Sequence, residues 1–126
     1  MAEQRISVQR VHDVVKGEAD PRGRVFLVDR LWPRGVRKEA LALDGWPKDA
    51  APSSQLRRWF GHDPARWDDF ADRYHAELQS RPEALEPLLA ALGEGAVTLL
   101  YAARDTEHNN AVVLRDHLLH LFEQGH

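Results

Sequence analysis

The chain has 126 residues, of which 43% are hydrophobic and 29% are charged, and its formal charge at neutral pH is -3. A chain of this length buries about two thirds of its unfolded surface on folding, so we expect one domain, residues 1–126, that needs no disulfide or metal for stability. The acidic balance provides no overall positive field, which argues against nucleic acid as the main partner. Cysteine is absent, which excludes thiol nucleophiles, disulfides and cysteine-ligated metals.

The hydropathy of the sequence argues against a membrane protein. No apolar stretch approaches the roughly 20 residues that a membrane-spanning helix needs, and residues 1–5 lack the apolar centre of a secretory signal. We therefore expect a cytoplasmic protein with no membrane partner, while the sequence gives no indication of its oligomeric state.

Three segments have the pattern of strands. Residues 6–11 alternate between apolar and polar side chains, as a half-exposed strand does, and a polar loop is predicted from there to residue 23. Residues 24–29 and 96–103 are short apolar runs bounded by turn residues, which is typical of strands buried on both faces. Residues 41–46 fit either a short strand or a packed loop.

Capping residues mark the beginnings and ends of the first two predicted helices. Ser53 is a suitable N-cap for a helix that ends at Gly61, and Asp63 is a suitable N-cap for a second helix with Pro64 in its first turn. The second helix carries an apolar face at three- and four-residue steps, made of Trp67, Phe70, Ala71, Tyr74 and Leu78.

Two further helices complete the plan. One begins at Pro82 and stops at residues 93–95, and Pro87 is expected to kink or split it because proline lacks a backbone donor. The last helix, residues 110–123, places one apolar stripe toward the core, made of Ala111, Leu114, Leu118, Leu121 and Phe122. The order of strands and helices predicts a single three-layer α/β domain with a small, mostly parallel sheet flanked by helices.

The segment after the second predicted strand carries Asp29, Arg30, Trp32 and Arg34. Pro33 prevents immediate helix formation, so the arginines are expected on a loop surface, where guanidinium groups suit carboxylates and phosphates. The alternative is structural: Asp29 pairs with an arginine to fix the loop, and Trp32 simply packs.

The last predicted strand, residues 96–103, contains Tyr101 and leads to Arg104, Asp105, His108 and Asn109. Free backbone N–H groups at the start of the following helix favour an anion there, and His108 could carry a proton near neutral pH. The alternative makes Asp105, Asn109 or Asn110 a helix cap and His108 an exposed loop residue.

Both segments follow strands, so both are expected at the carboxyl edge of the sheet, where ligands bind in such folds. Other motifs give weaker evidence for a functional site. Trp59 and Phe60 are read as core, and His62 either faces the site or is solvated. His117 and His120 are three residues apart on the last helix but lack an acidic partner, so no metal is expected. The sequence contains no glycine-rich phosphate cradle of the Walker or dinucleotide type, and no other cofactor is expected.

Three motifs also resemble one known family. Residues 27–35 (LVDRLWPRG), 59–64 (WFGHDP) and 99–105 (LLYAARD), followed by His108 and Asn109, are similar to the YeaO-like proteins, domain of unknown function 488. The resemblance spans residues 8–118 and implies a small cytoplasmic bacterial or archaeal α/β protein. It implies little about activity.

Three hypotheses follow for this arginine-rich edge. The first is an enzyme for a small phosphorylated or carboxylated substrate such as a nucleotide, in which Asp29 or His108 moves a proton. Its binding residues would be Arg30, Trp32, Arg34, Tyr101, Arg104, Asp105 and Asn109. The second is a non-catalytic anion-binding module for a nucleotide, a nucleic-acid end or an acidic partner. The third is a buried charge network that serves only the fold.

Overall fold

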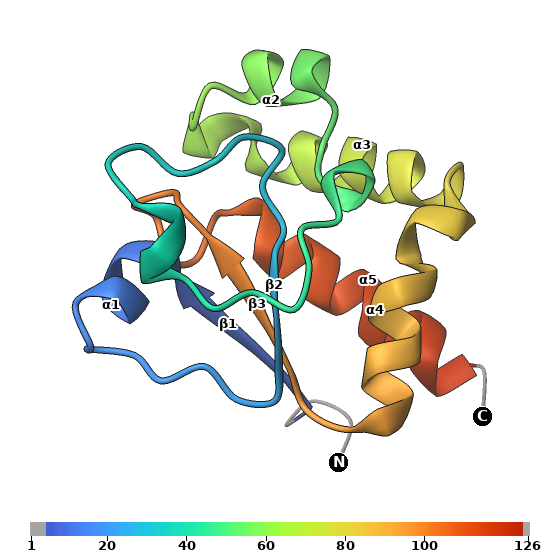
Figure 1. The fold of residues 1–126 in the computed structure, drawn as a ribbon. Helices are drawn as coiled ribbons and strands as arrows, with labels where there is room; N and C mark the ends of the chain where they lie inside the picture. Colours follow the sequence, from blue (N-terminus) through green and yellow to red (C-terminus); the bar gives the residue numbers. More distant parts are fainter. Residues whose placement is uncertain (1–4, 125–126) are drawn as a thin grey trace.

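A three-stranded parallel sheet organises the protein (Figure 1). The computed structural model describes residues 5–124. Its strands are β1 (Ile6–Arg10), β2 (Arg24–Leu27) and β3 (Val97–Tyr101), in the order β1-β3-β2. Val97 is in register with both Ile6 and Arg24, so all three strands run side by side in the same direction. The prediction of an α/β domain with a small parallel sheet is confirmed.

The central strand β3 is buried along its whole length. Its sequence is VTLLY, and apolar side chains on both faces require a covering layer on each side of the sheet. The one polar side chain, Thr98, is satisfied because its hydroxyl donates to the carbonyl of Arg22 and accepts from the Arg22 N–H, both at 2.8 Å.

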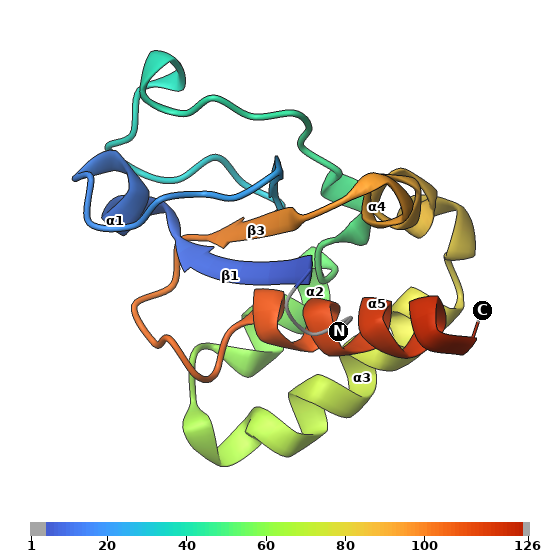
Figure 2. The same cartoon turned by 90° about the horizontal axis from the view of Figure 1, so that it is seen from below.

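Helices cover one face of the sheet (Figure 2). They include α2 (Ser54–Phe60), α3 (Trp67–Gln79) and α5 (Asn110–Gln124), while α4 (Pro82–Glu94) leads back into β3. The predicted caps are confirmed: the Ser53 side chain accepts from the Leu56 N–H, and Gly61 ends α2 in the left-handed conformation. Asp63 caps a 3-10 turn, Pro64–Arg66, that precedes α3.

A largely irregular segment covers the opposite face. It packs with the short helix α1 (Val11–Val15) on a second apolar cluster made of Val11, Val25, Leu27, Leu41 and Leu100. The predicted strand 6–11 ends one residue earlier, at Arg10, and the predicted polar loop after it was wrong at its start, because residues 11–15 are helical. Val11 is fully buried. Residues 41–46 form a packed loop with a single parallel bridge from Gly45 to Phe26.

Pro87 does not split α4, which was one of the two outcomes expected of it. Its missing N–H would have bonded to the carbonyl of Glu83, and both residues lie on the exposed side of the helix. Water can therefore satisfy that carbonyl, so the helix continues through the proline. None of the helices within residues 5–124 is long and apolar enough to cross a membrane.

Candidate functional site

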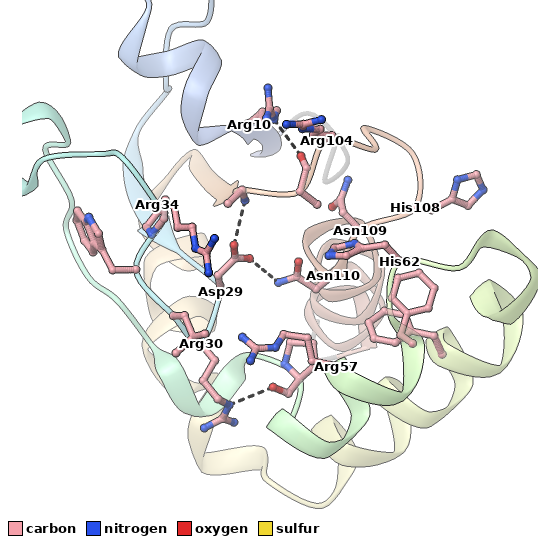
Figure 3. Close-up of a pocket in the computed structure, with 18 of the residues that line it drawn as sticks. Arg10, Asp29, Arg30, Arg34, Arg57, His62, Arg104, His108, Asn109 and Asn110 are labelled. Atoms are coloured by element: carbon pink, nitrogen blue, oxygen red, sulfur yellow. Dashed lines mark hydrogen bonds between the residues drawn. The ribbon is translucent and has the colours of Figure 1, made fainter.

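A cavity of about 540 Å³ lies at the carboxyl edge of the sheet (Figure 3). The segments that follow β2 and β3 form two of its walls, and α2 with the joint after it forms a third. The end of β1 contributes Arg10 and the start of α1 contributes His12. All three parallel strands end at this edge, so residues from distant parts of the sequence meet here.

The cavity unites most of the residues that the sequence singled out. Seven of the nine line it: Asp29, Arg30, Trp32, Arg34, Arg104, His108 and Asn109. The other two, Tyr101 and Asp105, are absent from its wall. Tyr101 is only 3% exposed and belongs to the apolar core, so the structure gives it no contact with a ligand in this cavity.

Asp29 connects the two arginine-bearing segments. One of its carboxylate oxygens accepts from the backbone N–H of Ala102 at 3.0 Å, and the other accepts from the Asn110 amide at 3.0 Å. The same amide donates to the Val28 carbonyl at 2.9 Å. Burial raises the pKa of the Asp29 carboxyl. The hydrogen bonds from Asn110 and Ala102, the positive charge of Arg57 and the charge of His62 when it is protonated oppose the rise in this pKa.

Two side chains of the first segment have structural partners. The Arg30 guanidinium donates to the carbonyls of Pro52 at 3.1 Å and Ala51 at 3.4 Å. The Trp32 indole donates to the Val36 carbonyl at 2.7 Å and packs edge-on against Trp46. These contacts fix the segment on the irregular face of the molecule, as the structural alternative for Trp32 anticipated.

Other arginines in the cavity have no such partners. Arg34, Arg58 and Arg104 are exposed and make no hydrogen bond or salt bridge with any residue that the structure describes. Arg10, by contrast, donates to the Ala103 carbonyl at 3.0 Å. The cavity therefore combines arginines that hold its walls with arginines whose guanidinium groups remain available.

Asp105 and His108 form a local pair. The His108 Nδ1 atom lies 2.9 Å from an Asp105 carboxylate oxygen, and the other oxygen accepts from the N–H groups of Glu107 and His108. These backbone hydrogen bonds, followed by the His108 side chain, lower the pKa of the Asp105 carboxyl. The His108 ring also meets Trp67 edge-on, at the outer side of the cavity (Figure 3). The two candidate proton carriers, Asp29 and His108, are thus held by separate networks.

Asn109 is the helix cap that the sequence allowed as an alternative. Its side-chain oxygen accepts from the Val112 N–H at 3.1 Å, and its amide donates to the Asp105 carbonyl at 3.0 Å. The residue is 2% exposed. Although Asn109 lines the cavity, these contacts use its polar atoms to begin α5.

Sequence reasoning missed several cavity residues, chiefly Arg10, His12, Arg57 and Arg58, and it named Asn110 as a possible helix cap but not as a site residue. One signal was present, because Arg10 ends a strand that parallel pairing brings to the same edge. The arginines of α2 carried no such signal, since only packing of the helices turns that end of α2 toward the cavity. His62, left open between two roles, lines the cavity and has a positive backbone φ of 58°.

The charges around the cavity are strongly unequal. Among the described residues that line it, six are arginine and one is aspartate. Since the complete chain carries a formal charge of -3, the positive charge is concentrated locally. Arginines around a partly enclosed cavity attract anions more strongly than the same groups on an open surface.

The remaining histidine motif lies elsewhere. His117 does not pair with His120 but contacts His75 of α3, and the two Nδ1 atoms are 2.9 Å apart. Burial, with the neighbouring charges of His75 and His120, lowers the pKa of His117. No group of three potential metal-ligating side chains occurs among residues 5–124.

Fold and site together define a small α/β protein with an arginine-lined cavity. Residues 5–126 match the family model described as the inactive DUF488-N3 subclade. The chain is 42% identical over 113 residues to the uncharacterized protein Rv3073c of Mycobacterium tuberculosis (strain ATCC 25618 / H37Rv), covering 89% of this chain and 92% of the relative. It is 40% identical over 113 residues to the uncharacterized protein YeaO of Escherichia coli (strain K12), covering 90% and 96%. The chain belongs to the YeaO-like DUF488 family. No solved structure matches it.

Proposed function

We propose that this protein is a non-catalytic module that binds a small phosphorylated or carboxylated ligand in the arginine-lined cavity. The observation that carries this proposal is the lining of six arginines and one aspartate. Arg34, Arg58 and Arg104 make no hydrogen bond or salt bridge with a described residue, so their donors can be satisfied by a ligand. Guanidinium groups bind carboxylate and phosphate oxygens through paired hydrogen bonds.

The dimensions and position of the cavity support a small ligand. Its volume of about 540 Å³ is within the range of small-molecule sites, which is about 300–1,000 Å³. Helix α5 begins at the cavity wall with Asn109 and Asn110, and the positive end of its dipole adds to the attraction for an anion. A nucleotide, a nucleic-acid end or an acidic peptide terminus fits these requirements. The overall acidic charge disfavours duplex nucleic acid.

Binding is favoured over catalysis by the placement of the two candidate proton carriers. Both carboxylate oxygens of Asp29 already accept hydrogen bonds that join the walls, and His108 lies at the outer side of the cavity (Figure 3). The description of the family subclade as inactive points the same way.

Calorimetric titration with inorganic phosphate and with adenosine monophosphate tests the proposal. We expect saturable binding that weakens as salt is added, and we expect Arg34→Ala and Arg104→Ala each to lower the affinity about tenfold, since each removes a charged hydrogen-bonding partner. Arg115→Ala is the matched control, because Arg115 lies on α5 outside the cavity and pairs with Asp116. Binding that neither cavity substitution alters, or no saturable binding at all, would refute the proposal.

The second candidate is an enzyme, and the Asp105–His108 pair favours it. A carboxylate on Nδ1 orients an imidazole so that Nε2 can exchange a proton with a substrate. His108→Ala distinguishes the two functions once a ligand is known: lost turnover with retained affinity indicates an enzyme, whereas unchanged ligand behaviour indicates binding alone.

A further inference from the structure

His62 has a backbone conformation that histidine rarely adopts. Its φ is 58°, and it follows Gly61, whose φ is 54°, so the joint between α2 and the 3-10 turn contains two consecutive left-handed residues. Glycine adopts this conformation freely, but the Cβ of any other residue makes it costly. His62 is the one non-glycine residue with a positive φ among residues 5–124. Residues with such conformations cluster at active sites and ligand-binding sites.

The strained residue also faces the cavity. His62 lines it, and its side chain lies on the cavity side of the joint (Figure 3). The ring centroid is 6.0 Å from that of Phe60, and no hydrogen bond or salt bridge with a described residue occupies its nitrogens. His62 is close enough to Asp29 for its charge to influence that carboxyl. The imidazole is thus an exposed group on the cavity wall, and its ring nitrogens can contact a ligand.

The surroundings of His62 are mostly cationic. Arg57 and Arg58 lie on α2, and Asp63 is its neighbour in sequence, although that carboxylate caps the Ala65 N–H and pairs with Arg66. The segments opposite contribute the remaining charged and titratable groups of the wall, namely Asp29, Arg30, Arg34, Arg104 and His108, and the β1 end contributes Arg10 and His12. An anion bound among these groups favours the protonated form of a neighbouring imidazole.

We propose that His62 is the proton-dependent contact of the cavity and makes it select a doubly charged phosphate monoester over singly charged phosphodiesters and carboxylates. This inference rests on the proposed anion-binding function. A phosphate monoester loses its second proton at about pH 6, so near neutral pH it carries almost two charges. An imidazole that takes up a proton on binding contributes one positive charge and one hydrogen bond to the ligand, in addition to those of the arginines. A monoanion gains less from that additional charge.

The test uses matched probes, methyl phosphate and dimethyl phosphate, titrated into the wild-type protein from about pH 5.5 to pH 8.5. We expect the monoester to bind at least about tenfold more tightly than the diester near neutral pH, since the extra charged contact is worth that factor. Binding of the monoester should take up a proton, which calorimetry in two buffers of different ionisation enthalpy measures. Its affinity should pass through a maximum and fall at high pH.

Two substitutions separate the effect of the imidazole from the effect of the left-handed backbone conformation. His62→Gly relieves the left-handed strain, so it should melt at the wild-type temperature or higher while its monoester affinity drops several-fold, its proton uptake disappears and its affinity no longer falls at high pH. His62→Asn tolerates the conformation and keeps a donor without titrating, so it should retain part of the affinity and no proton uptake. His120→Ala, on the exposed side of α5, is the control.

The outcomes distinguish failure of this inference from failure of the proposed anion-binding function. If His62→Gly binds methyl phosphate with wild-type affinity, pH profile and proton uptake, the role of His62 is refuted while phosphate binding stands. If the wild type binds the two probes equally, selection of the dianion is refuted. If the wild type binds neither these probes nor inorganic phosphate and adenosine monophosphate saturably, the anion-binding function itself is wrong.

Discussion

The segments that follow β2 and β3 carry the same pair of residue types, Asp29 with Arg30 and Arg104 with Asp105, but use them in opposite ways. In the first segment the aspartate joins the cavity walls and the arginine is fixed by backbone carbonyls. In the second the arginine is exposed and pairs with no residue that the structure describes, and the aspartate organises its own loop outside the cavity. The pKa of Asp29 is raised by burial, whereas that of Asp105 is lowered by hydrogen bonds. Similar residue types at equivalent strand ends thus gain different roles from their surroundings.

The largest effect is expected from breaking the link between the segments. Asn110→Ala removes the amide that bridges Asp29 and the Val28 carbonyl, and leaves a half-buried carboxylate with fewer partners. We expect unfolding free energy to fall by about 2 kcal/mol, the usual result of unpairing buried polar groups. Chemical denaturation measures this, with Arg115→Ala on the same helix as the control. Alanine forms helices better than asparagine, so helix propensity cannot cause the loss. Wild-type stability in this variant would show that the link is unimportant.

The two arginines should then differ in their contributions to stability. Arg30→Ala loses the hydrogen bonds to Pro52 and Ala51 and should cost about 1 to 2 kcal/mol. Arg104→Ala removes an exposed side chain and should change stability by less than about 0.5 kcal/mol. Thermal melts of both variants measure the difference. Strong destabilisation by both would instead support a charge network that serves the fold, and would contradict the division of roles described above.

The two aspartates should give opposite pH dependences. A raised pKa in the folded protein means that Asp29 ionises less readily than in the unfolded chain, so its ionisation removes stability as pH rises from the ordinary value of 3.8 through the raised value. A lowered pKa means that Asp105 contributes stability that is complete above 3.8 and is lost as pH falls through the lowered value.

Melting temperatures of Asp29→Asn and Asp105→Asn, each compared with the wild type from neutral pH down to about pH 3, test these signs. On acidification the Asp29→Asn variant should lose stability relative to the wild type, because the wild type regains what ionisation removed. The Asp105→Asn variant should gain relative to the wild type over the lower part of this range. Differences that move in the same direction would contradict the contrast between the two carboxyl groups.

The smallest effect is expected at Tyr101, which the sequence included among the binding residues. Its side chain is buried in the core and outside the cavity wall, so Tyr101→Phe preserves the ring that packs there. We expect unchanged phosphate affinity and a stability change of less than about 0.5 kcal/mol. A clear loss of phosphate affinity, measured by the same calorimetric titration, would show that Tyr101 contributes to ligand binding.

The sequence by itself determined the elements whose signals are local. The run of apolar residues at 97–101 indicated a buried strand, and Ser53 and Asp63 marked helix starts because a cap bonds only two or three residues away. Parallel strands joined by helices also placed both arginine-bearing segments at one edge, since such connections return the chain to the same end of the sheet. The location of the cavity followed from these facts.

Only the tertiary structure decided which side chains are engaged and which are free. The bond from Asn110 to Asp29 spans 81 residues, and the bond from Arg30 to Pro52 joins a loop to a distant segment, so no local periodicity encodes either. The packing of α2 brought Arg57 and Arg58 to the cavity, and the joint after α2 forced His62 into a left-handed conformation. A charge acquires its role from groups that only folding brings near, because burial and hydrogen bonding depend on three-dimensional neighbours.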